Sequence, residues 1–355
     1  MRHLVDIKDF SVDEIYELLE VAEDIMQNEK KYEESAKGKI LATLFFEPST
    51  RTRLSFESAM YKLGGNVLTL SNVGSSSEKG ESTSDTVRTV GCYSDIIAMR
   101  HPNEGTQLSC IPQSSVPIIN AGDGKHAHPT QTLTDLLTIK HSVGRLENMS
   151  IGLCGDLKYG RTVHSIIIAM ARHSNIKFVL ISPKELKCPN GVIKIAEEQG
   201  VKFEYEENLA KAMPKLDVLY MTRVQGERFE DKDEFLRLRD SFILDNEKLT
   251  NAKESLVIMH PLPRVNEIAI EVDSDPRACY FKQVENGKFV RMALILKLLK
   301  EIDMDSNIDC TGELTTHICK NKGCVTNVDN RTVRRSFTKS DGTKKCLYCE
   351  SGFEA

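Results

Sequence analysis

The sequence predicts an α/β protein with two doubly wound parallel-sheet domains and a small β-rich module at the C-terminus. Three observations lead to this fold class. Short apolar runs alternate with amphipathic helical stretches, this series occurs twice, and the composition changes after residue 302. Repeated strand–helix order is typical of parallel sheets joined by right-handed crossovers. We therefore expect domains at 1–145, 146–285 and 304–355, with a helix at 286–303 that returns to the first domain.

The composition is that of a globular protein. The chain has 355 residues, of which 40% are hydrophobic, and this is enough for two compact cores. Its apolar runs, such as IIIAM at 166–170, fall far short of the roughly 20 residues that a membrane helix needs. The acidic N-terminal stretch, with Ser11 and Glu14 spaced as a capping box, is unlike a signal peptide. We therefore expect a cytoplasmic protein with no membrane partner.

The elements follow one another in a regular order. A strand at 40–46 is followed by a helix with apolar residues at helical spacing from Leu54 to Leu63, which Gly64 ends. The first half continues with an expected strand at 66–70, a helix from about 83, a strand at 95–99, and a strand, loop and helix within 116–144. The second half is expected in the stretches 149–173, 177–183, 191–200, 201–206, 215–224 and 255–264, before a last helix at 290–302. The polar clusters follow apolar strands, where parallel sheets bind ligands.

The stretch FEPSTRTR places hydroxyl and guanidinium groups at the start of a helix. A net charge of −5 argues against general nucleic-acid binding, so an anion site must be built locally. N–H groups in the first helical turn lack intrahelical partners and attract anions. The hydroxyls of Ser49, Thr50 and Thr52 add donors, and Arg51 adds a planar fork that suits phosphate oxygens. This predicts a phosphate site; taken alone, the motif also fits an ordinary helix cap with solvated arginines.

Further polar residues suggest donors for a reacting carbonyl group. Arg100 ends a predicted strand, and His128 and Gln131 lie at the start of the next helix. Such donors can stabilise a carbonyl oxygen that gains charge during a reaction, although a lone histidine is more often structural. The serine-rich loop and the second half add cationic and amide groups at Lys79, Arg161, Arg223 and Gln225.

Seven ordered motifs resemble the aspartate carbamoyltransferase catalytic chain, and the resemblance covers about residues 1–302. The motifs are FEPSTRTR, SSSEKGES, MRHP, AGDGKHAHPTQTLTDLLTI, GDLKYGRTVHS, TRVQGERF and MHPLPRVNEI. Ornithine carbamoyltransferases share the STRTR and HPTQ elements, but they have a His-Cys-Leu-Pro motif where this chain has Pro261 after His260. Arg223 with Gln225 also suits an acceptor rich in carboxylates. Aspartate is therefore the expected acceptor, and another amine such as ornithine is the alternative.

The resemblance implies the carbamoyltransferase fold and transfer of a carbamoyl group from carbamoyl phosphate to the amine of L-aspartate. The products would be N-carbamoyl-L-aspartate and phosphate, an early step of de novo pyrimidine biosynthesis, with no cofactor required for the chemistry. The catalytic residues that it implies are Arg51, Thr52, Arg100 and His128. Carbamoyl phosphate would bind at Ser49, Thr50, Arg51, Thr52, Arg100, His128, Gln131 and the backbone carbonyls of Pro261 and Leu262.

For aspartate, the resemblance implies binding by Ser75, Lys79, Arg161, Arg223 and Gln225. Ser75 and Lys79 would reach the site of a neighbouring subunit, which implies a homotrimer, or a larger assembly of trimers, with shared active sites. From the residues alone, a flexible exposed loop is the alternative. Glu47 would pair with Arg161 and Arg228 when the domains close. A silent scaffold is the non-enzymatic alternative, which the complete set of ligating residues disfavours.

Five of the ten cysteines lie after residue 302. Cys319 and Cys324 are separated by four residues and Cys346 and Cys349 by two, with 21 residues between the pairs. Two close pairs around a hairpin with an Asp-Gly turn predict a tetrahedral structural zinc site. Metal binding would supply much of the folding free energy of so small a module. Free thiols or disulfides are the alternatives, and Cys310 and His317 are weaker candidate ligands.

The cysteine spacing resembles the zinc domain of the aspartate carbamoyltransferase regulatory chain. The larger nucleotide-binding domain of that chain has no room in the short segment before Cys319, so the resemblance implies a role in assembly rather than a response to nucleotide effectors. A nucleic-acid-binding zinc ribbon is the alternative, because the stretch NRTVRRSFTKSDGTKK is basic. Its single aromatic residue, Phe337, offers no stacking array, so we expect no nucleic-acid partner.

Overall fold

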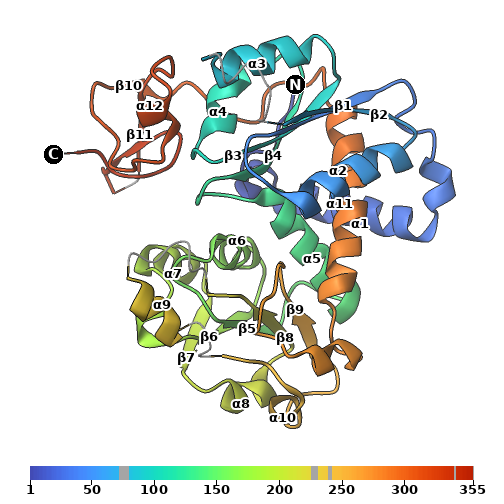
Figure 1. Ribbon diagram of the computed structural model, residues 1–355, viewed down its shortest axis with the longest axis vertical. Helices are drawn as coiled ribbons and strands as arrows, with labels where there is room; N and C mark the ends of the chain where they lie inside the picture. Colours follow the sequence, from blue (N-terminus) through green and yellow to red (C-terminus); the bar gives the residue numbers. More distant parts are fainter. Residues whose placement is uncertain (72–79, 225–230, 239–241, 340, 355) are drawn as a thin grey trace. The chain divides into compact units, whose positions relative to one another are not determined.

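A computed structural model describes residues 1–71, 80–224, 231–238, 242–339 and 341–354 (Figure 1). The chain divides into two compact units, one formed by Met1–Thr130 with Lys288–Ala355 and the other by Gln131–Gly287. Each unit contains a parallel sheet, and a small antiparallel sheet lies near the C-terminus, which confirms the predicted fold class. Within the described ranges, no helix is long and apolar enough to cross a membrane.

The sheet of the first unit contains four parallel strands in the order β2-β1-β3-β4. These strands are β1 (Ile40–Phe45), β2 (Asn66–Ser71), β3 (Ile96–His101) and β4 (Ile118–Asp123). Residues 96–99 of β3 have no exposed surface, as expected for a strand that is covered by helices on both faces. Phe45, at the end of β1, pairs with Arg100 in β3. The carboxyl ends of β1 and β3 therefore lie next to each other.

Helices pack on both faces of this sheet. On one face, Val87 and Cys110 pack with Leu44 and Met99 of the strands, and Figure 1 shows other helices, including α2 and α11, on the opposite side. The helices of this unit are α1 (Val12–Gln27), α2 (Thr50–Lys62), α3 (Thr83–Gly91) and α4 (Thr106–Cys110), while α5 (Pro129–Val143) and α11 (Tyr280–Lys300) cross the unit boundary.

The ends of two helices match their predicted signals. Ser11 Oγ accepts a hydrogen bond from the Glu14 backbone N–H at 3.1 Å, and Glu14 Oε2 accepts one from the Ser11 N–H at 2.8 Å. This is the expected capping box at the start of α1. Helix α2 ends at Lys62, and Gly64 follows with φ +78°, a backbone conformation that favours glycine.

The sheet of the second unit has five parallel strands in the order β7-β6-β5-β8-β9. The strands are β5 (Met149–Cys154), β6 (Ile176–Ile181), β7 (Lys202–Glu206), β8 (Val218–Met221) and β9 (Val257–Met259). The helices are α6 (Arg161–Met170), α7 (Asn190–Glu197), α8 (Leu209–Ala212), α9 (Lys232–Leu238) and α10 (Asn246–Leu249). Side chains of β5, β6, β8 and β9 form a buried core with Leu209, Leu244 and Tyr280.

The C-terminal residues form the predicted small β-rich module, which belongs to the first unit. It contains β10 (Glu313–Leu314), α12 (Val325–Val328), β11 (Arg335–Thr338) and β12 (Lys344–Cys346). β11 and β12 pair antiparallel on either side of Asp341 and Gly342, as the hairpin prediction required. In Figure 1 this red module lies beside α4, and Leu108 of α4 packs against its cysteines.

Each parallel sheet has one topological switch point. In the first unit the chain adds β2 on one side of β1 and then β3 on the other, and in the second unit β5 lies between β6 and β8 in the same way. Ligands of open α/β sheets bind at such points, outside the carboxyl ends of the strands. The loops after β1, β3, β5 and β8 are therefore where a site is expected.

Candidate active site

The predicted phosphate site lies directly after β1, at the first switch point. Ser49 is the N-cap residue and Thr50 begins α2. Among the described residues, the Ser49 side chain makes no capping hydrogen bond to the helix, so its hydroxyl is not used to satisfy the helix start. Thr50 and Arg51 are exposed and Thr52 is buried. The stretch combines a helix N-terminus with hydroxyl groups and a guanidinium, which suits a phosphate dianion.

Arg100 reaches the same switch point from β3. Its Nε donates a hydrogen bond to Glu47 Oε2 at 3.1 Å, and its Nη1 lies 3.5 Å from the Ala121 carbonyl oxygen. Gly122, with φ +124°, makes room for the guanidinium, because an added Cβ would lie 3.0 Å from Arg100 Nη1. Only 11% of the Arg100 side chain is exposed. The protein therefore holds a largely buried cation beside the phosphate site, next to Glu47.

His128 lies in the loop between β4 and α5 and is buried. Its Nδ1 is 3.5 Å from Thr130 Oγ1. Helix α5 begins at Pro129, so the imidazole is presented immediately before the first helical turn. A buried imidazole at this position can donate a hydrogen bond to a substrate oxygen.

Gln131 belongs to the second unit and contacts a buried carboxylate. Its Nε2 donates to Asp135 Oδ1 at 2.8 Å, and Gln283 Nε2 donates to the same oxygen at 2.7 Å. Asp135 Oδ2 accepts a hydrogen bond from the Tyr220 hydroxyl at 2.9 Å. These bonds fix the orientation of the Gln131 amide, so its Oε1 is the atom that remains for accepting a hydrogen bond from an amide substrate.

Arg161 and Arg223 follow β5 and β8, the two strands at the second switch point. The loops that carry them are joined by Asp156 and Thr222: the Asp156 N–H donates to Thr222 Oγ1 at 3.1 Å. Gly155 has φ +113°, and an added Cβ would collide with the Thr222 carbonyl oxygen. Arg161 begins α6 and Arg223 lies in the loop after β8, so the structure holds the segments that precede both arginines together at the end of the sheet.

The stretch after β9 is organised by a buried histidine–glutamate pair. The Leu262 N–H donates to His260 Nδ1 at 2.8 Å, so the imidazole proton is on Nε2, which lies 2.7 Å from Glu267 Oε1. Burial lowers the pKa of His260 despite the neighbouring Glu267 carboxylate. Leu262 has φ +54°, an uncommon conformation for a residue with a side chain. The pair thus supports the backbone around Pro261 and Leu262, whose carbonyls are candidate acceptors.

Arg291 is a residue that the sequence analysis did not identify. It lies in α11, is 4% exposed, and donates through Nη1 to Ser55 Oγ at 3.1 Å. Its Nη2 lies 3.4 Å from Thr130 Oγ1, and its guanidinium lies 5.1 Å from the Phe56 ring centroid. Arg291 therefore links α2, whose N-terminus is part of the predicted phosphate site, to Thr130, which lies two residues after His128. An arginine within the apolar stretch VRMALIL was the available signal.

Four predicted residues lie outside the described residues: Ser75, Lys79, Gln225 and Arg228. For Glu47, the structure shows the contact with Arg100 given above. Its predicted pairing with Arg161 and Arg228 stays a prediction.

The four cysteines of the C-terminal module form one cluster. The sulfur atoms of Cys319, Cys324, Cys346 and Cys349 all lie within 4.8 Å of one another, and all four residues are buried. All four are free cysteines, as is Cys310. Cys310 packs instead with the core of the first unit, and the ring of His317 lies against that of Phe353. Burial and the neighbouring sulfur of Cys349 raise the pKa of the Cys319 thiol to about 12. Such a group of buried sulfurs fits a metal ion, whose charge would stabilise the thiolates.

Two family profiles match the chain. One is described as aspartate/ornithine carbamoyltransferase, carbamoyl-P binding domain, and matches residues 2–141; the other, the Asp/Orn binding domain, matches residues 147–298. A curated relative, the aspartate carbamoyltransferase catalytic subunit of Clostridium kluyveri, is 56% identical over 84% of this chain and 98% of its own length. The corresponding subunit of Lachnoclostridium phytofermentans is 57% identical over 86% of this chain and 100% of its own length.

Solved structures agree with these matches. The catalytic subunit of M. jannaschii aspartate transcarbamoylase gives a TM-score of 0.81 at 46% identity, covering 86% of this chain and 100% of that chain. Aspartate transcarbamoylase from Trypanosoma cruzi, in complex with carbamoyl phosphate and aspartate, gives a TM-score of 0.79 at 38% identity, covering 84% of this chain and 96% of that chain. The chain therefore belongs to the aspartate/ornithine carbamoyltransferase family, and within it to the aspartate carbamoyltransferase catalytic chains.

Proposed function

We propose that this protein is an aspartate carbamoyltransferase, which transfers the carbamoyl group of carbamoyl phosphate to the amine of L-aspartate. The observation that carries the proposal is the pair of switch points, one with hydroxyl groups, a helix N-terminus and Arg100, the other with Arg161 and Arg223. The first set suits a phosphate and the second suits carboxylates. Relatives with this name at 56% and 57% identity support the same activity.

Carbamoyl phosphate binds to the first set. Ser49, Thr50, Arg51 and Thr52 hold the phosphate oxygens, and Arg100 bridges the phosphate and the carbonyl oxygen. Thr52 and His128 donate to that carbonyl oxygen, which becomes more negative as the nucleophile attacks. The Oε1 of Gln131 and the backbone carbonyls of Pro261 and Leu262 accept hydrogen bonds from the carbamoyl amide. The carbonyl carbon is thereby oriented and made more electrophilic.

Aspartate binds next, through its two carboxylates. Arg161, Arg223 and Gln225 pair with them, together with Lys79 and Ser75 from a neighbouring subunit. The deprotonated amine attacks the carbonyl carbon, forming the new C–N bond and a tetrahedral intermediate. The C–O bond to phosphate then breaks, and the leaving phosphate accepts the proton of the amine. Positioning and charge stabilisation account for this reaction without a nucleophilic side chain.

The cysteine cluster is proposed to hold a structural zinc ion through Cys319, Cys324, Cys346 and Cys349. Four sulfur ligands in tetrahedral arrangement are typical of such sites. The ion would cross-link the module and supply folding free energy, and it would make no direct contact with the reacting groups. The three domains are proposed at 1–145 with 286–303, 146–285 and 304–355, in a cytoplasmic homotrimer or a larger assembly of trimers.

Product analysis tests this proposal. Purified full-length protein is incubated with carbamoyl phosphate and either L-aspartate or L-ornithine, and the product mass and the released phosphate are measured together. We expect N-carbamoyl-L-aspartate and stoichiometric phosphate with aspartate only. Formation of a carbamoylated ornithine would overturn the acceptor assignment, and no product with either amine would overturn the proposed activity.

A further inference from the structure

The C-terminal module holds a short segment of the first unit by backbone hydrogen bonds. The Glu104 N–H donates to the Gly323 carbonyl oxygen at 2.9 Å, and the Val325 N–H donates to the Glu104 carbonyl oxygen at 2.9 Å. Asn321 Nδ2 also donates to Glu104 Oε2 at 2.7 Å. Glu104 therefore forms a bridge with the part of the module that contains Cys324, one of the clustered cysteines.

The next residue fits closely against the module. Gly105 has φ +80°, and an added Cβ would collide with Tyr348, which lies between two of the clustered cysteines in the sequence. Its backbone N–H donates to Asp123 Oδ2 at 3.0 Å. Gly105 thus contacts the module on one side and Asp123 on the other.

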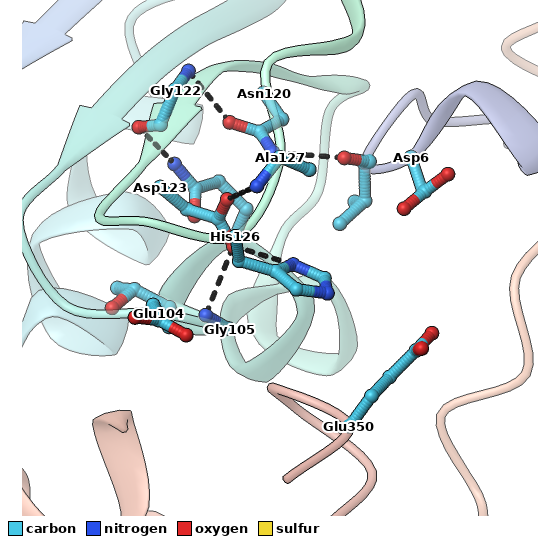
Figure 2. A network of polar contacts seen from close by, with 12 residues as sticks. Asp6, Glu104, Gly105, Asn120, Gly122, Asp123, His126, Ala127 and Glu350 are labelled. Carbon is cyan, nitrogen blue, oxygen red and sulfur yellow. Dashed lines mark hydrogen bonds and ion pairs between the residues drawn. The ribbon is translucent and has the colours of Figure 1, made fainter. Parts of the chain in front are cut away.

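Asp123 organises the loop that leads to His128 (Figure 2). Its Oδ1 accepts a hydrogen bond from the Ala127 N–H at 2.7 Å, and its backbone N–H donates to the Ala127 carbonyl oxygen at 3.2 Å. The His126 N–H donates to the Asp123 carbonyl oxygen at 3.0 Å. The fully buried side chain of Asp123 and its backbone together close the loop onto itself, immediately before His128.

The Asp123 carboxylate lies beside the imidazole of His126 in the same loop. His126 Nδ1 lies 3.4 Å from Asp123 Oδ2, and Figure 2 shows Asp6 and Glu350 nearby. Burial lowers the pKa of His126, but the Asp123 carboxylate outweighs it, with smaller contributions from Asp6 and Glu350, and raises that pKa to about 10. Asp123 also follows Gly122, whose lack of a side chain makes room for Arg100. The loop thus runs from the contact with Arg100 to His128.

We propose that Asp123 is a positioning residue that couples the C-terminal module to the active site: the module holds Glu104 and Gly105, Gly105 holds Asp123, and Asp123 fixes the loop before His128. This inference rests on the proposed function for the role of His128. It gives the module a function within its own chain, in addition to any role in assembly. Loss of the metal ion releases Gly105 and Asp123, and carbamoyl phosphate binding weakens.

Hydrogen–deuterium exchange of the zinc-loaded full-length protein tests the coupling without relying on activity. The wild type is compared with the same protein after chelation, with metal content measured, and with Asp123→Asn. Both changes are expected to speed exchange in residues 122–128 by about tenfold, while residues 149–181 of the second unit exchange as before. After chelation, Asp123→Asn is expected to show no further increase.

Two more variants distinguish the effect of the contact at Gly105 from the effect of metal loss. Gly105→Ala places a Cβ against Tyr348 and should reproduce the faster exchange with the metal still bound. Asp85→Asn removes a different contact with the module, the ion pair with Arg331, and should leave residues 122–128 unchanged. Binding of phosphonoacetamide, an unreactive analogue of carbamoyl phosphate, is expected to weaken about tenfold in Asp123→Asn and Gly105→Ala but not in Asp85→Asn.

Other outcomes would overturn the coupling or count against the proposed function. Unchanged exchange in residues 122–128 after verified metal loss, or in Asp123→Asn, would overturn the coupling, as would an increase spread evenly over both units. Tight phosphonoacetamide binding by the wild type with unaffected binding in both test variants would overturn the coupling alone. Absence of phosphonoacetamide binding by the wild type would instead count against the proposed function.

Discussion

At the scale of single residues, the proposed site depends on partners that hold each charge in place. Arg100 contacts Glu47 through Nε and the Ala121 carbonyl through Nη1, which keeps its planar guanidinium in one orientation. A lysine there would offer a single charged point in place of this fork. The planar shape of the Arg100 guanidinium, and not only its charge, should therefore matter for carbamoyl transfer.

Replacing Arg100 tests this dependence. Arg100→Met removes the proposed donor to the phosphate and to the developing oxyanion, and kcat with aspartate should fall by roughly 100-fold or more. Arg100→Lys should recover only a small part of that loss. Steady-state kinetics measure both variants against Arg237→Met, which removes an exposed arginine paired with Glu185 and should behave as the wild type. A kcat for Arg100→Met within twofold of the wild type would contradict the assigned role.

Two buried histidines should make the protein less stable in acid. His3 Nδ1 accepts a hydrogen bond from the Ile118 N–H at 3.1 Å, and His101 Nδ1 accepts one from the Asn103 N–H at 3.1 Å. Burial lowers the pKa of each from 6.5 to about 4. Between these values the unfolded chain binds more protons than the folded one, so the free energy of unfolding falls as the pH falls from 6.5 towards 4.

Urea unfolding at pH 7 and pH 5 measures this effect. The wild type should lose stability between the two conditions, and His101→Gln, which keeps a hydrogen-bond acceptor, should lose less. His141→Gln, which replaces an exposed histidine, serves as the control. Equal losses in the wild type and His101→Gln would show that His101 does not contribute to the acid sensitivity.

At the scale of elements, α11 contacts α2, the helix that begins the proposed phosphate site. Its Arg291 donates to Ser55 of α2 and lies 3.4 Å from Thr130 Oγ1 in the first turn of α5, and all three residues lie within the first unit. Removing this guanidinium takes a charged hydrogen-bond donor away from the Ser55 and Thr130 hydroxyls, and the loss of such hydrogen bonds costs about 1–3 kcal/mol. The element therefore links stability to the placement of the phosphate site.

Arg291→Met keeps the length and apolar stem of the side chain but removes its donors. We expect a free energy of unfolding lower by about 1–3 kcal/mol and a KM for carbamoyl phosphate that rises more than the KM for aspartate. Denaturant unfolding and initial rates measure the two effects. Lys282→Met, on the exposed side of the same helix and paired with Glu285, is the matched control. An unchanged KM for carbamoyl phosphate would contradict the link.

Features whose whole signal lies in one short stretch could be predicted from the sequence. Apolar runs predicted β1 and β3, and the paired cysteine spacing predicted the cluster at Cys319 to Cys349. Strand β10 could not be predicted, because its two exposed residues, Glu313 and Leu314, carry no pattern. The contacts of Arg291 and the contact of Gly105 with Asp123 could not be predicted either, because they join residues that are distant in the chain. Ser55 and Arg291 are 236 positions apart.

At the scale of the whole molecule, the chain combines a catalytic part with a metal-binding module. The family profiles end at residue 298, and the relatives described above cover 84–86% of this chain while matching nearly their full length. The cysteine cluster lies beyond the profiles, yet its module contacts Glu104 and Gly105 within the first profile. The module is thus packed against the catalytic part within the same unit.

If active sites are shared between subunits, as proposed, two inactive variants should restore activity together. Lys79→Met would lack the lysine that is proposed to serve a neighbouring subunit's site. Arg100→Met would lack a group that each subunit is proposed to supply to its own site. When the two are unfolded together and refolded as mixed trimers, random pairing should restore about a quarter of the sites. Activity of the mixture measures this, with each variant refolded alone as control. A mixture no more active than the separate variants would contradict sharing.

The central claim is carbamoyl transfer to aspartate, and a competition experiment tests it most directly. Wild-type protein is given ¹³C-labelled carbamoyl phosphate with equal concentrations of L-aspartate and L-ornithine, and ¹³C NMR follows the carbonyl signals. We predict that the label moves to N-carbamoyl-L-aspartate, with no carbamoylated ornithine above the level without protein. Label in carbamoylated ornithine would contradict the proposed function. So would a carbamoyl phosphate signal that disappears only at the uncatalysed rate of carbamoyl phosphate breakdown.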